Sequence, residues 1–346
     1  MRRVPLLVAL GLSGCELITE AHEFEFHEGL CTECVEPDLK RAPCPTPSEA
    51  PDLDEDFVFA AEEGRFTGLD AQGRLPGLDR DCSAEAKPSR CRPRVDPPTN
   101  GWEPRPMGID NSAAQRMFMP LEELAAAAGY ESNLNLDYRD GLHLGLLVIL
   151  RNYNGTPDDS SVEVSLHSSP GVSKSNGPPR WDGTDTWDLH DGEDGSPEPF
   201  LRIERAEGYV SGGVLVVDYR HKGQQTFRIN TGFGEPFRLL VRDIVLVGNI
   251  DSETMRDVVF SAIADYDSLI ESVPAASQTL AACFPEVVST VEQLLGIYLE
   301  EAVDMPSATA SSEDELCGGV SLAFSAWGKR ARLGGFSVAA PRNCGD

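Results

Sequence analysis

Short apolar runs separated by turn-forming residues fill the middle of the chain, and they constrain its fold more than any other feature. These runs are Leu142–Leu150, Val162–Leu166, Phe200–Ile203, Tyr209–Tyr219, Gln225–Ile229 and Phe237–Val247. Between them lie clusters such as Asn152–Asp159 and Ser168–Pro179, which are rich in Gly, Pro, Ser and Asp. Apolar runs of this length with such boundaries are typical of strands. Many strands without regular intervening helices predict a mainly β fold, an antiparallel β-sandwich of the jelly-roll kind.

Residues from about 251 to 305 interrupt this pattern. Their apolar positions recur at helical spacing, as in Met255, Val258, Val259, Ala262 and Leu269, and again in Val287, Val288, Val291, Leu294, Leu295 and Tyr298. This spacing predicts two helices separated near 274–285, and a further helix is expected over 112–128. Strand-like runs at 319–327 and 333–339 follow. Residues 107–346 are therefore predicted to form one β-sandwich domain with a helical insertion before its last strands.

The N-terminus has the composition of an export signal. Arg2 and Arg3 precede an apolar run, which ends in Leu12-Ser13-Gly14-Cys15. Positive charge, an apolar segment and small residues in this order indicate a secretory signal, and the run is too short to span a bilayer. The last four residues resemble the lipobox of bacterial lipoproteins. That resemblance implies removal of residues 1–14, lipidation at Cys15 and anchoring in the cell envelope, with the outer membrane favoured over the inner.

The segment from 15 to 106 differs in composition from the rest. Residues 15–63 contain fifteen acidic side chains against two basic ones, and proline recurs through the segment. A chain this acidic and rich in proline buries little apolar surface. We therefore expect an extended, largely irregular stalk over residues 15–106. The formal net charge of −28 for the whole chain excludes nucleic acid as a natural partner, because phosphate would be repelled.

Eight cysteines remain after Cys15 is set aside, and all are candidates for disulfides: Cys31, Cys34, Cys44, Cys82, Cys91, Cys283, Cys317 and Cys344. An even number in an exported chain indicates disulfides whose pairing the sequence leaves open. Cys82 and Cys91 are close enough for a local pair. Cys31 and Cys34 have the spacing of a zinc or redox pair, but no second ligand pair lies nearby, which disfavours metal.

Three motifs in the second half of the chain carry a family resemblance. They are Gly108-Ile109-Asp110-Asn111, Trp181-Asp182-Gly183-Thr184-Asp185-Thr186-Trp187, and the run from Cys317 to Phe324. Together they resemble uncharacterised myxobacterial-type secreted lipoproteins over residues 108–346. Those proteins begin with a lipobox and a variable acidic stalk. The resemblance implies an address in the cell envelope and no particular activity.

Carboxylates crowd the segment from 181 to 199, which contains no Lys or Arg. The candidate ligands are Asp182, Asp185, Asp188, Asp191 and Asp194. Calcium prefers such oxygen ligands, and glycines at 183, 192 and 195 permit tight turns, so this loop is a candidate calcium site. Asp52, Asp54, Asp56 and Glu63 form a weaker candidate, because Phe57 stands where a calcium loop needs glycine. A solvated acidic turn is the alternative for both.

Trp181 and Trp187 are candidate ligand-binding residues. Two indoles in one loop could stack on a sugar ring, or they could pack beneath the loop as apolar anchors. A glycosidase needs two carboxylates at a defined separation, which the sequence does not give. The available candidates are Asp182, Asp185, Glu204 and Asp218. Ser211-Gly212-Gly213 lacks the pattern of a serine hydrolase.

These observations predict a membrane-anchored extracytoplasmic lipoprotein with a binding or structural role and no catalytic residues of its own. Its expected partners are the membrane, through the lipid, and a carbohydrate or another envelope protein. The alternative is a calcium-assisted carbohydrate-active hydrolase.

Overall fold

The computed structural model describes residues 56–65, 91–92, 94, 111–119, 139–173, 177–190, 201–219, 223–229, 237–281, 288–310 and 315–337. The strands are β1 (Phe57–Arg65), β2 (Leu142–Arg151), β3 (Asp159–Val172), β4 (Thr186–His190), β5 (Leu201–Ser211), β6 (Val214–Asp218), β7 (Gln225–Ile229), β8 (Phe237–Ile250), β9 (Thr254–Asp265) and β10 (Gly319–Ser337). The helices are the short π-helix η2 (Ala113–Phe118) and the α-helices α4 (Tyr266–Ala281) and α5 (Val288–Ala302). The fold is mainly β, as the apolar runs predict.

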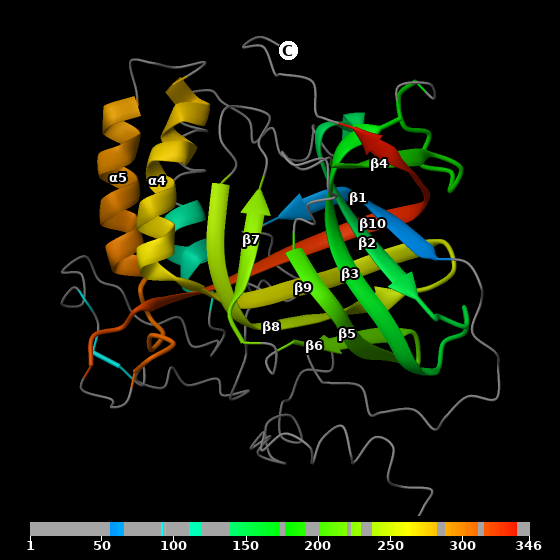
Figure 1. Cartoon of the computed structure of the whole chain (residues 1–346), viewed down its shortest axis with the longest axis horizontal. Helices are drawn as coiled ribbons and strands as arrows, with labels where there is room; N and C mark the ends of the chain where they lie inside the picture. The colour runs from blue at the N-terminus through cyan, green and yellow to red at the C-terminus, as the bar shows by residue number, and fades with distance from the viewer. Residues whose placement is uncertain are drawn as a thin grey trace, which may run out of the picture.

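Eight antiparallel strands close into a barrel in the order β1-β2-β3-β5-β6-β8-β9-β10, and β10 pairs back onto β1. The ring follows the order of the chain, with β4 and β7 attached outside it (Figure 1). At the closure, Val58 lies opposite Ala331. The predicted jelly-roll sandwich is therefore wrong. A sandwich keeps two sheets with open edges, whereas this sheet curls until its first and last strands meet.

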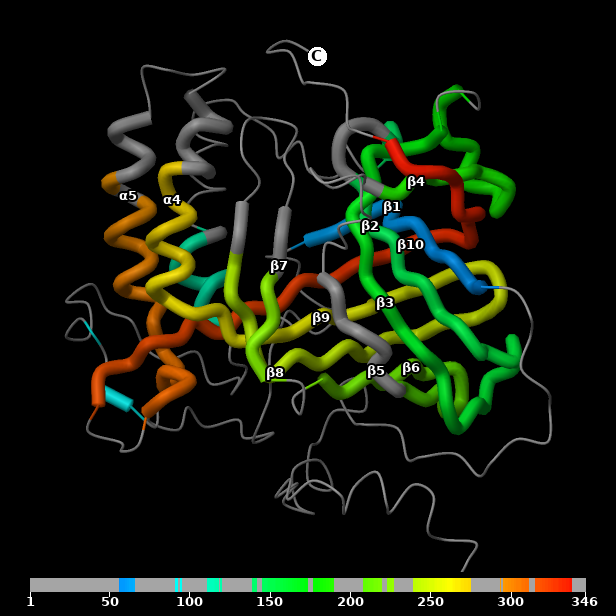
Figure 2. The backbone as a smooth tube through the Cα atoms, viewed as in Figure 1, coloured from blue at the N-terminus to red at the C-terminus, as the bar shows by residue number. Residues whose placement is uncertain are grey.

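Alternate side chains fill the barrel. In β2, Leu146, Val148 and Leu150 join the main core, while Leu147 and Ile149 point to the opposite face. Successive side chains of a strand face opposite ways, and an eight-stranded barrel encloses about enough room for side chains. The same core continues into α4 and α5, which lie side by side next to the barrel (Figure 2).

A second, smaller ring uses the opposite face of the same strands. β4 pairs in parallel with β10 and antiparallel with β3, which closes the order β1-β2-β3-β4-β10. Its apolar cluster contains Val58, Ala60, Leu147, Ile149, Trp187, Leu189 and Ala331. β1 and β2 are consequently buried on both faces. This explains why residues Leu146–Leu150 of β2 are all apolar instead of alternating with polar residues.

Part of the expected irregular stalk is a strand, β1. The irregular segment was predicted to extend from 15 to 106, but Phe57–Arg65 is a strand between β2 and β10. Residues 91, 92 and 94 also lie against the folded domain, through contacts with residues 315–317. The remainder of the predicted stalk lies outside the described residues, as does the signal segment with Cys15.

The first predicted helix of the insertion is wrong over most of its length, because that segment forms β9. The structure begins α4 only at Tyr266, and Thr254–Asp265 is a strand paired with β8 and β10. α5 matches the second predicted helix. Of the helix expected over 112–128, the structure describes the short π-helix η2, and the part beyond 119 lies outside the described residues. Within the described part of the chain, no helix has the length and apolar character needed to cross a bilayer.

Candidate functional site

The loop of residues 177–185 is the described part of the connection that leads into β4, and it is bound to the end of the barrel. The backbone carbonyl of Asp185 accepts a hydrogen bond of 2.8 Å from the amide of Arg332 in β10. Gly183 adopts a φ of 82° beside Arg330, so a tight turn needs glycine here. The loop thus sits over the edge of the smaller ring, with Trp181 packed against its apolar cluster.

The Asp185 side chain stabilises the conformation of this loop through hydrogen bonds to its backbone. Its side chain is buried, with the residue only 3% exposed, and Oδ2 accepts hydrogen bonds from the amides of Arg180 and Trp181 at 2.9 and 2.6 Å. Trp181 has a φ of 55°, in the left-handed region that residues other than glycine rarely adopt. Two amides bound to one buried carboxylate stabilise that conformation. The loop is therefore preformed.

Asp182 of the loop and Asp188 of β4 also bind their own chain. Asp182 Oδ1 accepts hydrogen bonds from the Thr184 hydroxyl and amide, at 2.5 and 3.0 Å, and these bonds lower the pKa of Asp182. Asp188 Oδ1 accepts from the Ser173 hydroxyl and from the Gly335 amide. Each carboxylate thus fixes a local turn or strand end.

The calcium hypothesis stays a prediction. Asp182, Asp185 and Asp188 are the described members of the candidate set, whereas Asp191 and Asp194 lie outside the described residues. Over the described ranges, no three His, Cys, Asp or Glu side chains form a group that could hold a metal ion. In the second acidic run, Asp56 pairs with Arg151 at 3.3 Å and Glu63 pairs with Arg65.

The two tryptophans of the loop differ in exposure. Trp187 is 1% exposed and lies inside the smaller ring, whereas Trp181 is half-buried above it. Their ring centroids are 5.3 Å apart at an interplanar angle of 46°, and the Trp181 indole N–H donates to the Arg139 carbonyl at 3.1 Å. The interpretation of both rings as one open stacking platform is therefore wrong for Trp187. Trp181 is the ring that reaches solvent.

His167 lies on the same face of the sheet as this apolar cluster, opposite Leu147. Its Nε2 is 3.0 Å from the Ser165 hydroxyl. Burial, and then the positive charge of Arg151, lower the pKa of His167 to about 4. The imidazole is therefore neutral in the folded protein at neutral pH.

Replacing His167 with Gln is expected to reduce the loss of stability in mild acid. Because the folded pKa of about 4 lies below the unfolded value of about 6.5, the unfolded chain binds the proton first, and the free energy of unfolding falls as pH falls between these values. The expected difference is about 2–3 kcal/mol near pH 4.5. Urea unfolding of both proteins near pH 7 and pH 4.5 measures it. Equal losses in the two proteins would contradict a half-buried His167 that is neutral in the folded protein.

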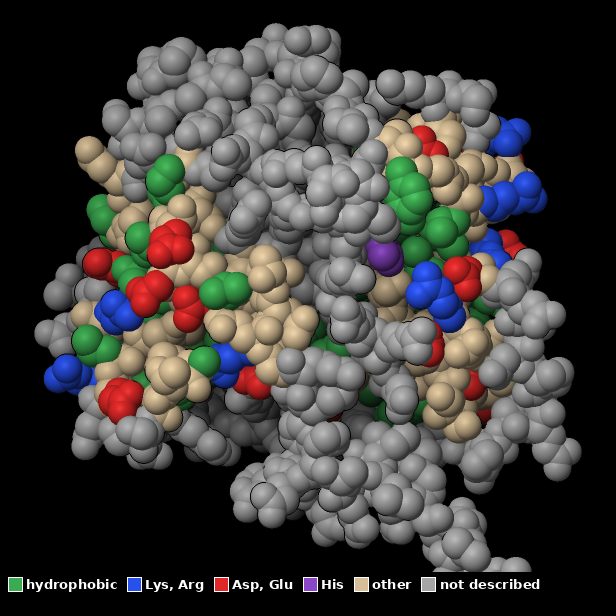
Figure 3. All heavy atoms as spheres, viewed as in Figure 1, with side chains coloured by type: hydrophobic (Ala, Val, Ile, Leu, Met, Phe, Trp, Pro, Cys, Tyr) green, Lys and Arg blue, Asp and Glu red, His purple; other side chains and the backbone are tan. Residues whose placement is uncertain are grey.

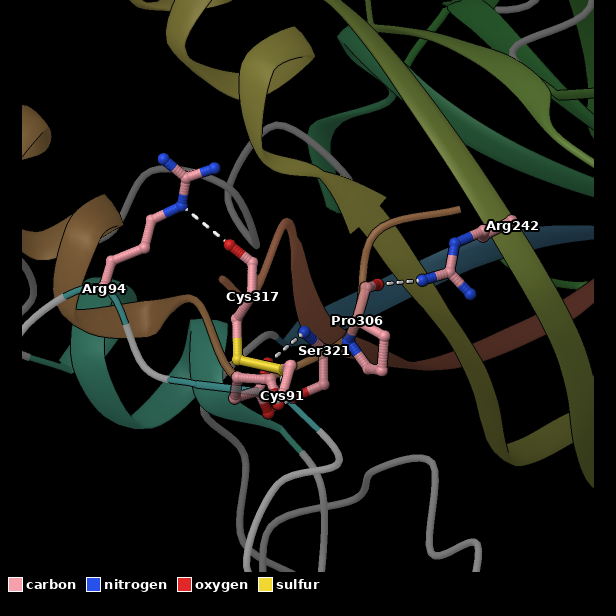
Figure 4. Close-up of a disulfide and its surroundings, with 7 residues drawn as sticks. Cys91, Arg94, Arg242, Pro306, Cys317 and Ser321 are labelled. Carbon is pink, nitrogen blue, oxygen red and sulfur yellow. Dashed lines mark hydrogen bonds between the residues drawn. A yellow bond between two sulfur atoms is a disulfide. The ribbon is translucent and has the colours of Figure 1, made fainter. Parts of the chain in front are cut away.

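A disulfide joins Cys91 to Cys317 across 226 residues of sequence (Figure 4). The proposed local pair of Cys82 with Cys91 is therefore wrong. The other six cysteine candidates, Cys31, Cys34, Cys44, Cys82, Cys283 and Cys344, lie outside the described residues. Around the bond, the Cys317 amide donates to the Arg92 carbonyl, and Arg94 Nε donates to the Cys317 carbonyl at 2.7 Å. Arg94 also stacks over Tyr266, 4.0 Å from its ring centroid.

The first and third motifs of the family resemblance have structural roles. Asn111 Oδ1 accepts hydrogen bonds from the amides of Ala114 and Ala323, which joins η2 to β10. Gly319 exchanges backbone hydrogen bonds with Met305, and a Cβ at this glycine would lie 2.7 Å from Ile263. These residues position the helices against the barrel, and the Ser321 hydroxyl of the third motif donates to Asp304. Gly108, Ile109 and Asp110 lie outside the described residues.

The remaining residues considered for catalysis are distributed along the strands. Glu204 lies in β5 and Asp218 ends β6. Ser211 ends β5 at a tight hairpin in which Gly212 and Gly213 have positive φ, so it occupies a turn and lacks the strand-to-helix setting of a nucleophile. Comparison with known protein families, curated proteins and solved structures gives no match.

Proposed function

We propose that the chain is a lipid-anchored protein of the cell envelope that binds an extracytoplasmic ligand without transforming it, through the surface of loop 177–185. The observation that carries this proposal is the buried Asp185 carboxylate, which fixes the backbone beneath Trp181. A preformed surface loses little conformational entropy when a ligand binds. The motif ending in Cys15 supports the anchor, with the outer membrane as its favoured location.

Carbohydrate is the ligand class that we favour. Trp181 offers a partly exposed aromatic ring supported from below by Trp187, and the polar side chains of Arg180, Asp182 and Thr184 lie beside it in the sequence and are exposed or nearly so. A sugar ring requires an apolar surface together with oriented hydrogen-bonding groups, and aromatic residues with a few polar neighbours supply both. Another envelope protein is the second ligand class that such a surface suits.

Replacing Trp181 with Ala is expected to weaken binding of a sugar at least tenfold, because the stacking surface is removed. The mature chain with Cys15 changed to Ser is first screened on an oligosaccharide array. The best ligand is then titrated by tryptophan fluorescence against Trp181→Ala. Trp327→Ala is the matched control, since Trp327 is also a partly exposed ring but stacks on Arg65 and donates to Asp257.

Unchanged affinity in Trp181→Ala, or an equal loss in both variants, would contradict the proposed surface. If the array shows no binding, carbohydrate is removed as the ligand class.

A further inference from the structure

Among their described side chains, the two α-helices each expose one narrow stripe to solvent. In α4, the exposed residues are Asp267, Ile270, Glu271 and Pro274, and in α5 they are Gln293, Ile297 and Glu300. Spacings of three, four and seven residues place side chains on one face of a helix. Each stripe thus sets one isoleucine next to a carboxylate, with Ile270 36% and Ile297 53% exposed. Figure 3 shows apolar and acidic side chains on the surface over α4 and α5, with Lys or Arg side chains beside them.

The charges of α5 are not arranged for helix stability, whereas Asp267 lies in the first turn of α4, where a carboxylate is favourable. Neither sequence contains a Lys or Arg, and α5 places Glu300 and Glu301 in its last turn. The C-terminal end of a helix is negative, so carboxylates there are unfavourable. Arg116 of η2 interacts electrostatically with Glu301. Residues that break a local rule in this way are commonly found at functional sites.

Pro274 lies on the exposed stripe inside α4 and has no N–H to donate to the carbonyl of Ile270, four residues earlier. The exposed stripe of α4 thus combines an apolar side chain with the carboxylates of Asp267 and Glu271. Both carboxylates accept hydrogen bonds and carry negative charge.

We propose that the exposed face of α4 and α5 docks a cationic protein segment, an amphipathic helix whose Lys or Arg side chains flank apolar residues. Charge complementarity selects this occupant. The carboxylates repel nucleic acid and anionic lipid head groups, and a second copy of this chain carries the same net charge of −28. The isoleucine side chains contact the apolar residues of the partner, and the carboxylates bind its Lys or Arg side chains. This surface is separate from loop 177–185 and does not depend on the function proposed for that loop.

The test uses a synthetic amphipathic helical peptide with lysines on both sides of a leucine stripe. Its binding to the mature chain carrying Cys15→Ser is measured by fluorescence anisotropy at physiological salt. Ile270→Ser combined with Ile297→Ser is expected to weaken binding at least tenfold. The matched control is Leu333→Ser combined with Phe336→Ser, which removes two exposed apolar residues from β10. Thermal melting confirms that both variants are folded.

A second readout examines the charges. Glu271→Gln combined with Glu300→Gln is expected to weaken binding severalfold and to reduce its dependence on salt. A peptide with glutamate in place of lysine should not bind. The proposal is overturned if the lysine peptide does not bind at about 100 µM, a concentration well above the micromolar affinities of specific complexes. It is also overturned if the isoleucine and control variants lose affinity equally, since that result indicates attraction to the net charge alone.

Discussion

Replacing Cys15 with serine is expected to move the protein from the membrane to the soluble fraction. The proposed anchor is attached through the cysteine thiol, and a serine hydroxyl does not accept the lipid. Each buried methylene contributes about 0.8 kcal/mol to membrane binding, so removal of several acyl chains eliminates stable attachment. Fractionation without detergent, together with labelling by a fatty-acid probe, measures the change.

Cys31→Ser is the matched control, because it removes a cysteine downstream of Cys15 and leaves the lipobox intact. This variant should keep both the label and the membrane location. The lipid-anchor proposal fails if Cys15→Ser still sediments with membranes in a high-salt wash.

Loss of the Cys91–Cys317 bond is expected to cost about 5 kcal/mol of unfolding free energy, since its 226-residue separation strongly restricts the unfolded chain. This figure is a large part of the total stability of a typical domain. Chemical denaturation of the oxidised wild type and of Cys91→Ala combined with Cys317→Ala provides the comparison. We expect a lower midpoint in the variant and a larger denaturant dependence, because the unlinked chain expands further when it unfolds.

Cys91→Ala alone should cost nearly as much as the double change, because either substitution breaks the same bond. A loss below about 1 kcal/mol would show that the backbone hydrogen bonds of Arg92 with residues 315 and 317 hold this segment without the disulfide.

Some strands of the middle region could be predicted from the sequence because their signal is local. The expected run Tyr209–Tyr219 is instead split between β5 and β6 by a turn at Gly212 and Gly213, and the expected turn cluster from Ser168 begins inside β3. β2 and β7 begin at the residues expected from the apolar runs, and β8 extends the expected run by three residues. In each case apolar and β-branched residues end at Asp or Asn. No distant contact is needed to recognise such a pattern.

β1 and β9 could not be recognised in this way. β1 is a short apolar segment inside an acidic region, so the average composition concealed it. In β9, Asp257 has a φ of 50° and forms a bulge, which places Met255 and Val258 on the same face although they are three residues apart. This spacing is also that of a helix. A single inserted residue therefore made a strand resemble a helix.

Closure of the barrel and the roles of the loop residues depend on contacts between distant segments. The register of Val58 opposite Ala331 and of Val164 opposite Ala206 is not encoded in either segment alone. The sequence indicated that Trp181–Trp187 was a special loop. It did not show that Asp185 binds backbone amides, or that Trp187 is enclosed by strands that lie far away in the chain.

Because β1 pairs with the last strand of the chain, it waits for its partner longer than any other strand of the barrel. Its partner β10 begins at Gly319, so at synthesis rates of about 5–20 residues per second the edge of β1 that β10 will occupy stays open for roughly 15–50 s. During that time an apolar strand, destined for burial on both faces, is available to pair with other chains. The barrel therefore closes only after β10 has been made and has reached β1.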